Sequence, residues 1–207
     1  MDALNSTLSG FAAMSGWEYA AVALSVAYLL LAMRESLWCW PAAFFSTLIY
    51  TLMYWQGALL MESLLHFYYM GMAIYGWWAW RYGKERSQSQ GIVSYRLRTH
   101  AWLIAATALI AVCIGYVMDN YTRADYAYLD SLTTCFAVLT TYFVAKKVLE
   151  NWLYWVVIDA ASIYLYLAKG YYPTVVLFVF YTFMAITGYL RWRQQYQQKE
   201  QGVPAYA

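Results

Sequence analysis

Apolar positions along this chain gather in long blocks, not in the short alternating strands of a β-barrel. Seven such blocks are each long enough, or nearly so, for a helix to cross the hydrocarbon core of a bilayer. They cover residues 17–33, 38–55, 58–80, 98–118, 125–145, 151–168 and 172–192. A segment in lipid must satisfy its backbone hydrogen bonds internally, so helices are expected. The pattern predicts an all-α integral membrane protein with seven transmembrane helices.

Composition supports this fold class. Of the 207 residues, 63% are hydrophobic and only 12% are charged, about half the charged share of a typical soluble domain. The chain shows no basic patch that would bind nucleic acid. No Lys or Arg precedes Arg34, so the positive start of a signal peptide is absent and the first block is expected to remain as a span.

The distribution of basic residues predicts the orientation. Eleven Lys and Arg residues fall on the side that carries loops 1, 3 and 5 and the C-terminus, and two fall on the other side. Cytoplasmic loops carry this excess. We therefore expect a protein of the bacterial inner (plasma) membrane with residues 1–16 outside, and a loop over 81–97 and a tail over 193–207 in the cytoplasm.

A repeat is visible in the spacing of Trp and Gly. Four pairs recur at nearly one separation: Trp38 and Trp152 at 114 residues, Gly57 and Gly170 at 113, and Gly76 with Gly188 and Trp80 with Trp192 at 112. Three helices over 17–80 would then repeat over 125–192, with 98–118 as a linker helix. A single linker restores the direction of the chain, so the repeat is parallel. Transporters built from repeats hold their substrate near the middle of the membrane.

Ionisable residues within spans are few, and such residues usually mark a pathway. In the sixth span, Trp155, Asp159, Ser162 and Tyr166 share one helical face. A carboxylate between ring faces is suited to bind a cation, and the alternative is a structural Asp that is protonated or hydrogen-bonded between helices. The former is the prediction, because charged groups in a membrane are functional by default.

Other candidates lie in the third and fifth spans. Glu62, His66 and Tyr69 share a face of the third span, where His66 could donate to a substrate or simply bond to a neighbouring helix. Asp130 and Thr134 share a face of the fifth span, where Thr residues often only join helices. Several tryptophans near span ends are predicted to form an aromatic belt at the headgroups: Trp38, Trp40, Trp77, Trp78, Trp80 and Trp192. Trp152 could belong to the belt or to the site.

The sequence contains few features of an enzyme or of a metal site. The chain has no P-loop, zinc-protease or serine-hydrolase motif. Its two His and three Cys show no zinc-type spacing, and Cys39, Cys113 and Cys135 lie scattered in apolar blocks. No cofactor and no catalytic site are expected. No Lys or Arg lies deep in a span, so a phosphorylated substrate would lack an obvious partner.

Several motifs together resemble those of the PnuC family of vitamin transporters. In order along the chain they are Tyr75-Gly76-Trp77 with Trp80, Asp130-Ser131, Lys146-Lys147, and Glu150-Asn151-Trp152 with Trp155. The resemblance implies a 3+1+3 fold related to the SWEET sugar transporters, a homotrimer, and facilitated diffusion of a vitamin that a cytoplasmic kinase then traps. It also adds Asn151 and Trp152 to the candidate substrate-binding residues.

The resemblance leaves the vitamin open. Family members carry nicotinamide riboside, thiamine or riboflavin, and this sequence departs from the nicotinamide riboside pattern at His66, Ala73 and Asp159. Nicotinamide riboside is the first expectation and thiamine the second, since both carry a ring cation. A proton-coupled pump that uses Glu62, Asp130 or Asp159 as a relay is the alternative of another class.

Overall fold

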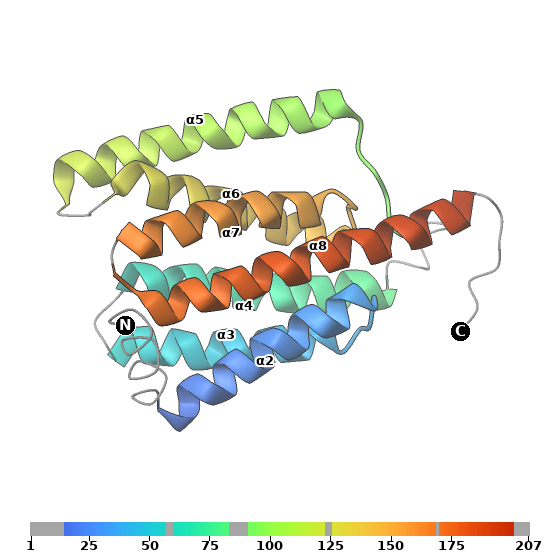
Figure 1. Cartoon of the computed structure of the whole chain (residues 1–207), viewed down its shortest axis with the longest axis horizontal. Helices are drawn as coiled ribbons and strands as arrows, with labels where there is room; N and C mark the ends of the chain where they lie inside the picture. The colour runs from blue at the N-terminus through green and yellow to red at the C-terminus, as the bar shows by residue number, and fades with distance from the viewer. Residues whose placement is uncertain (1–14, 57–59, 83–90, 123–125, 169, 201–207) are drawn as a thin grey trace.

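A computed structural model describes residues 15–56, 60–82, 91–122, 126–168 and 170–200. Within these ranges the chain forms seven α-helices (Figure 1). They are α2 (Gly16–Met33), α3 (Cys39–Gln56), α4 (Leu60–Tyr82), α5 (Leu97–Tyr121), α6 (Ala127–Ala145), α7 (Asn151–Ala168) and α8 (Tyr172–Glu200). The predicted all-α class is confirmed, and each of the seven helices lies at the position of a predicted span. The bounds differ by a few residues, except that α8 continues to Glu200, well beyond the predicted end of its span.

Local sequence explains where several helices begin and end. Ser15 and Glu18 form a reciprocal capping box at the start of α2. Pro173 lies in the first turn of α8, where its missing N–H is harmless. Residues 193–200 contain no Gly or Pro, so the polar end of α8 continues as a helix into the expected cytoplasmic tail.

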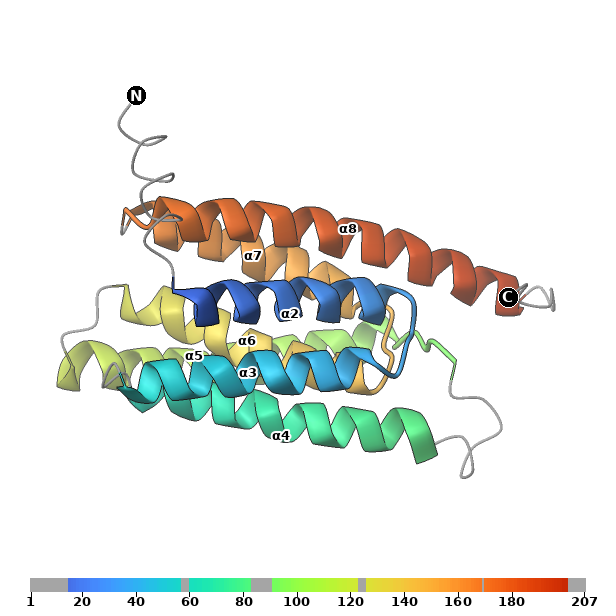
Figure 2. The same ribbon diagram turned by 90° about the horizontal axis from the view of Figure 1, so that it is seen from below.

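Six helices form a closed ring, and α5 lies outside it. Around the ring, α2 contacts α3, α3 contacts α4, α4 contacts α6, α6 contacts α7, α7 contacts α8, and α8 returns to α2. Helix α5 contacts α6 (Figures 1 and 2). Arg34, Lys146, Lys147 and Arg191 lie at one end of this ring, which we call the basic end.

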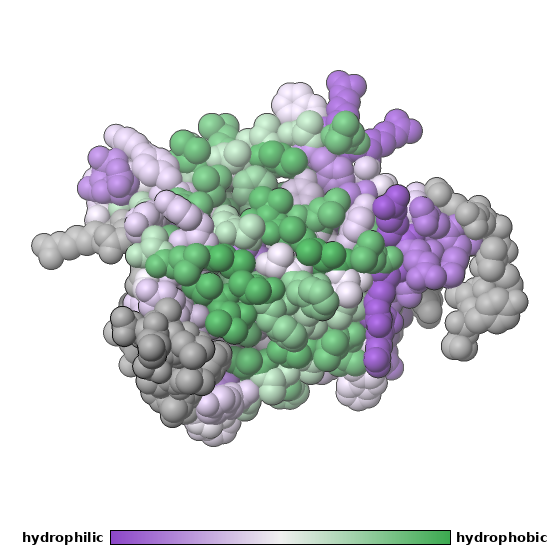
Figure 3. All heavy atoms as spheres, viewed as in Figure 1, coloured by the Kyte–Doolittle hydropathy of each residue, from purple (hydrophilic) through white to green (hydrophobic). Residues whose placement is uncertain are grey.

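The surface has the character of a membrane protein. Apolar side chains cover the middle of the molecule, and hydrophilic ones concentrate at the basic end (Figure 3). Among the described residues, four helices are long and apolar enough to cross a membrane: Gly16–Met33, Leu97–Tyr121, Ala127–Ala145 and Tyr172–Lys199. Helices α4 and α7 are rich in Tyr and Trp, whose polar groups lower the mean hydropathy of a helix that is otherwise apolar.

The predicted aromatic belt is wrong for three tryptophans. Trp38 and Trp78 are exposed, as a belt requires, but Trp40, Trp80 and Trp192 are at most 7% exposed. Together with Trp152, these three form an interior group that we call the tryptophan cluster. The Trp40 and Trp80 rings meet edge to face at 5.3 Å, and the Trp152 and Trp192 rings do so at 5.4 Å. Packing among helices, not the headgroup region, holds these rings.

Glycines admit two of the rings. A Cβ on Gly76 would lie 2.3 Å from the Trp40 ring, and a Cβ on Gly188 would lie 2.6 Å from the Trp152 ring. Only a residue without a side chain lets the helix backbone approach an indole this closely. Each glycine therefore fixes how deeply a tryptophan enters the bundle.

Corresponding contacts recur at one constant separation along the chain. Gly76 and Gly188 define it, and we call it the repeat spacing; Trp40 and Trp152, the rings that these glycines meet, are separated by the same amount. His66 and Tyr69 meet edge to face at 5.7 Å, and Phe178 and Tyr181, one repeat spacing later, do so at 6.1 Å. The separation between Trp38 and Trp152 exceeds this spacing by two positions. Trp38 is exposed, whereas Trp40 and Trp152 are both buried.

At the basic end, bonds join one half of the ring, α2–α4, to the other half, α6–α8. Lys147 Nζ lies 2.6 Å from the Glu35 carboxylate, and this ion pair joins the turn after α2 to the turn after α6. The Trp80 indole donates to the Ala145 carbonyl at 3.1 Å, and the Trp192 indole donates to the Ala32 carbonyl at 3.2 Å. Each half thus supplies a tryptophan donor that bonds to backbone of the other half.

Candidate functional site

Asp159 lies near the middle of α7 and is only 4% exposed. Among the residues that the structure describes, no basic side chain pairs with its carboxylate and no donor is hydrogen-bonded to it. A buried carboxylate is unfavourable unless it is paired, protonated or held ready for a ligand. Its side chain faces the interior of the ring and not the lipid.

Polar groups from three other helices gather near this carboxylate. Tyr181 of α8 lies within electrostatic range of both Asp159 and Tyr50 of α3, and it interacts with the Ser25 hydroxyl of α2. The Ser25 and Ser46 hydroxyls are 2.7 Å apart. We call these five residues, Asp159, Tyr181, Tyr50, Ser25 and Ser46, the central cluster. It brings together α2, α3, α7 and α8 inside a membrane-spanning ring.

Aromatic rings extend the central cluster. The His66 ring of α4 lies 5.5 Å from Tyr50 and 5.7 Å from Tyr69. On the α7–α8 side, Tyr166 stacks on Phe178 at 5.4 Å. The rings are half-buried, and their faces are attractive to a cation that has lost its water.

The predicted face of α7 points inward. Asp159 and Ser162 are buried, and Trp155 and Tyr166 are half-buried. Ser162 is 5% exposed and lies one turn beyond Asp159 toward the end of α7. Trp155, one turn earlier, packs against the core that holds the tryptophan cluster. The four predicted residues thus form a stripe from the basic end toward the opposite end.

Other predicted site residues lie apart from the central cluster. The Asn151 amide is fully buried at the start of α7 and donates to the Val148 carbonyl at 2.7 Å, and Trp152 belongs to the tryptophan cluster. Asp130 is in the first turn of α6, at the opposite end of the ring, with Thr134 one turn further in. The Glu62 side chain lies outside the described residues.

The sequence reasoning missed Tyr181, Tyr50, Ser25 and Ser46. Tyr181 follows Tyr69 by one repeat spacing, so a repeat aligned in the register of the structure would have indicated it. The stretch from 69 to 81 and the stretch from 181 to 193 share Tyr, Met-Ala-Ile, Gly and Trp-Arg at equal spacing. Ser25 and Ser46 carried a weaker signal, because isolated serines in spans usually serve helix packing.

A second polar array lies at the basic end, around Glu150. Its carboxylate accepts from the Ser94 hydroxyl and, at 3.4 Å, from the Tyr95 backbone N–H. His100 lies 3.6 Å from the same carboxylate and 2.9 Å from the Tyr154 hydroxyl. Nearby, the Val93 backbone N–H donates to the Lys147 carbonyl at 3.0 Å, and the Leu149 N–H donates to the Val93 carbonyl at 2.8 Å. The array fastens the segment before α5 to the turn between α6 and α7.

Two ionisable groups outside the spans are perturbed at this end. A hydrogen bond with Tyr75 raises the pKa of Lys146, against the smaller opposing effect of burial. Burial raises the pKa of Tyr95. Both groups keep their ordinary charge at neutral pH. The described residues contain no group of three or more His, Cys, Asp and Glu arranged to hold a metal ion.

Known proteins provide further evidence. A family model described as "Nicotinamide mononucleotide transporter" matches residues 15–194. The riboflavin/roseoflavin transporter RibM of Streptomyces davaonensis is 28% identical over 190 residues, or 88% of each chain. The nicotinamide riboside transporter PnuC of Escherichia coli is 23% identical over 171 residues, which is 70% of this chain and 71% of PnuC. A crystal structure of the vitamin B3 transporter PnuC matches with a TM-score of 0.70 and 16% identity, over 86% of this chain and 80% of that one.

Proposed function

Since this chain belongs to the nicotinamide mononucleotide transporter family and is a vitamin transporter of the PnuC type, we propose that it carries a dephosphorylated, cationic B-vitamin by facilitated diffusion. Nicotinamide riboside is the first candidate substrate and thiamine the second. A cytoplasmic kinase would phosphorylate the vitamin and so trap it. No catalysis is required of the protein itself.

The observation that carries this proposal is the buried Asp159 carboxylate. It has aromatic neighbours and no basic partner among the described residues. Two opposite charges about 4 Å apart attract by about 4 kcal/mol at an effective dielectric constant of 20. A ring face adds about 0.5–2 kcal/mol for a desolvated cation. Nicotinamide riboside and thiamine both have a ring cation that could replace the missing partner.

Riboflavin is a further candidate that differs from these two in charge, and the similarity to RibM favours it. Riboflavin has no permanent ring cation, so it would gain nothing from the Asp159 charge. The central cluster therefore supports a cationic vitamin over riboflavin. His66 and Tyr69 would contact the bound vitamin from α4, with Trp155, Ser162 and Tyr166 along α7.

The architecture that we propose is a parallel 3+1+3 repeat like that of the SWEET sugar transporters. In it, α2–α4 correspond to α6–α8, and α5 is the linker. The closed ring and the position of α5 outside it support this arrangement. The constant repeat spacing between matched contacts supports it as well. The central cluster would then lie where the two repeats meet, and alternating access would rock one repeat against the other.

Orientation and assembly complete the proposal. Cytoplasmic loops are enriched in Lys and Arg, so we place the basic end in the cytoplasm and the start of α2 outside, in a bacterial inner membrane. A homotrimer is the family expectation, and native mass spectrometry in detergent would measure it. Neither property is needed for the substrate proposal.

A binding experiment tests the substrate class. Isothermal titration of the purified protein with nicotinamide riboside, thiamine and riboflavin should give binding of at least one cationic vitamin in the micromolar range or tighter. Asp159→Asn should weaken that binding about 10–100-fold, which corresponds to about 1.4–2.7 kcal/mol. Asp119→Asn, at an exposed position near the end of α5, removes the same charge and should have no effect.

The possible results separate the alternatives. Tight binding of riboflavin alone, unchanged by Asp159→Asn, would replace the cationic vitamin with riboflavin. Binding of a cationic vitamin with unchanged affinity in Asp159→Asn would leave Asp159 a structural residue. If none of the three vitamins binds, the proposed substrate class is wrong.

A transport experiment tests the mechanism. In proteoliposomes, facilitated diffusion predicts that the internal vitamin concentration rises only to the external one. Accumulation beyond that level should require an encapsulated vitamin kinase with ATP. Accumulation without a kinase, abolished by a protonophore, would instead establish the proton-coupled alternative.

A further inference from the structure

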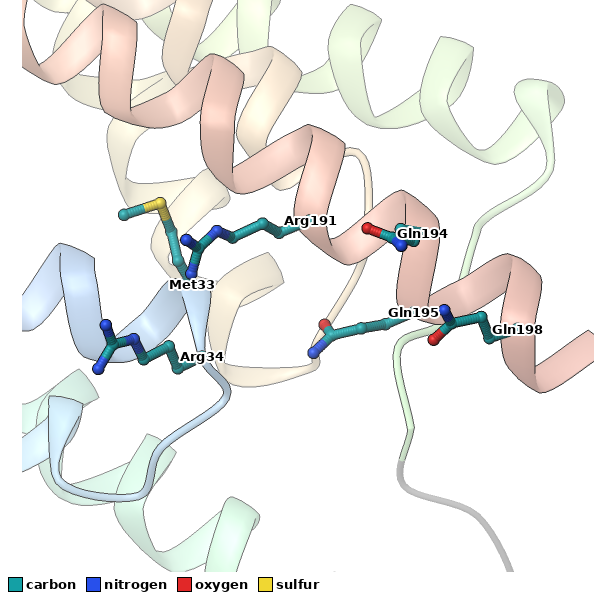
Figure 4. A pocket seen from close by; sticks show the side chains of 6 residues that line it. All are labelled: Met33, Arg34, Arg191, Gln194, Gln195 and Gln198. Carbon is teal, nitrogen blue, oxygen red and sulfur yellow. The ribbon is translucent and has the colours of Figure 1, made fainter. Parts of the chain in front are cut away.

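A hollow of about 340 Å³ lies at the basic end, between the end of α2 and the polar extension of α8. Its lining residues come from the end of α2, the residue that follows it, and α8 (Figure 4): Met33, Arg34, Arg191, Gln194, Gln195 and Gln198. The Arg191 side chain extends from α8 toward the end of α2 at Met33 (Figure 4). The hollow is far larger than the roughly 30 Å³ that one water molecule occupies, so it has room for a polyatomic ligand.

The hollow carries positive charge that no described carboxylate neutralises. Neither Arg34 nor Arg191 forms an ion pair within the described part of the chain. The carboxylate adjacent to Arg34, that of Glu35, is already bound to Lys147 at 2.6 Å. The three glutamines add amide donors without adding negative charge.

This chemistry fits a phosphate group. Guanidinium groups present paired N–H donors that match phosphate oxygens, and such charge-assisted bonds are stronger than neutral ones. We propose that Arg34 and Arg191, with the glutamine amides, bind a phosphate-bearing anion between α2 and α8. The anion is either the headgroup of an anionic lipid or a soluble phosphate.

The position of the hollow is suited to either source. The apolar runs of α2 and α8 end at Met33 and Leu190, immediately before the two arginines. The arginines therefore lie where the hydrocarbon core gives way to headgroups and water. Basic pockets between helices at this level bind anionic headgroups. A ligand here would join α2 to α8, and so would stabilise one of the two contacts between the halves of the ring.

Thermal unfolding of the full-length protein in nanodiscs tests the site. One arm compares phosphatidylcholine alone with phosphatidylcholine containing phosphatidylglycerol, and another adds inorganic phosphate to phosphatidylcholine nanodiscs. A saturating ligand should raise the Tm of the unmodified protein by about 3 °C or more. The double variant Arg34→Gln, Arg191→Gln should lose this increase. The control Arg98→Gln, Arg193→Gln removes the same charge at exposed positions outside the hollow and should keep it.

A third variant separates loss of the site from loss of folding. Gln195→Trp keeps both arginines but fills the hollow, and it should also lose the increase in Tm. Native mass spectrometry should show one fewer retained phosphatidylglycerol per chain if the ligand is a lipid. An increase with phosphatidylglycerol alone assigns the site to lipid, and an increase with inorganic phosphate assigns it to a soluble anion. If neither ligand raises the Tm, or if the Arg34/Arg191 variant responds like the control, the site does not exist.

Discussion

Replacing Gly76 with alanine tests the packing that closes the basic end. The new Cβ would lie 2.3 Å from the Trp40 ring, whereas carbon atoms in good contact are about 3.5 Å or more apart. The indole must therefore retreat by roughly 1.2 Å. Trp40 is 1% exposed and its ring already meets Trp80 edge to face at 5.3 Å, so little free space is available.

The expected loss follows from this geometry. Overpacking a tight interior costs about 1–3 kcal/mol. For a chain of about 200 residues, each kcal/mol lowers the Tm by about 2–4 °C. Gly76→Ala should therefore lower the Tm by about 2–12 °C. Gly71→Ala, earlier in α4, is a matched control because a Cβ there would meet nothing within 4 Å. Its Tm should stay the same or rise slightly, because alanine favours helix more than glycine does.

Cys39 provides a direct assay. It is fully buried beside Trp40 in the sequence, while Cys113 is exposed and Cys135 is half-buried. In a background with Cys113→Ala and Cys135→Ala, a thiol-reactive fluorophore reports the exposure of Cys39 as the protein is heated in detergent. The temperature of half-maximal reaction then gives the Tm of this region.

The comparison within α4 decides the outcome. Equal Tm values for Gly76→Ala and Gly71→Ala would show that the Trp40 ring moves without strain, and would refute the claim that Gly76 fixes its depth. A loss in both variants would point to a general sensitivity of α4. A second change, Trp40→Phe, should recover part of the loss caused by Gly76→Ala, because the smaller ring leaves room for the methyl group.

Three further predictions concern the same end of the molecule. Gly188→Ala should lower the Tm about as much as Gly76→Ala, because its Cβ would lie 2.6 Å from the Trp152 ring. An unchanged Tm in Gly188→Ala would contradict the proposed equivalence of α2–α4 and α6–α8. In a double-mutant cycle of Glu35→Gln and Lys147→Met, the free energies of unfolding should give a coupling of about 0.2–1 kcal/mol, as for other partly exposed ion pairs. Strictly additive effects would mean that the pair does not stabilise the fold. Glu150→Ala should accelerate amide hydrogen exchange at Tyr95 but not in the core of α7, and unchanged exchange at Tyr95 would rule out the anchoring role.

The helices could be predicted because their causes are local. A spanning segment closes its own hydrogen bonds, so a long apolar run is sufficient to specify a helix. The run over 151–168 agrees with α7 at both ends. The same local rule placed Trp155, Asp159, Ser162 and Tyr166 on one face. The high cost of a charge in lipid indicated that this face points inward, as observed for Asp159.

The partners of that face depend on the tertiary structure. Ser25 and Tyr181 meet near Asp159 although they come from opposite ends of the chain, and no pattern within either span encodes this contact. Likewise Trp38 and Trp40 are close neighbours in the sequence, yet one is 73% exposed and the other 1%. Trp38 lies in the turn immediately before α3, whereas Trp40 lies in the first turn of α3. The apolar character of both sides of α3 left their orientation undetermined by sequence, and the neighbouring helices and Gly76 decided which indole is buried.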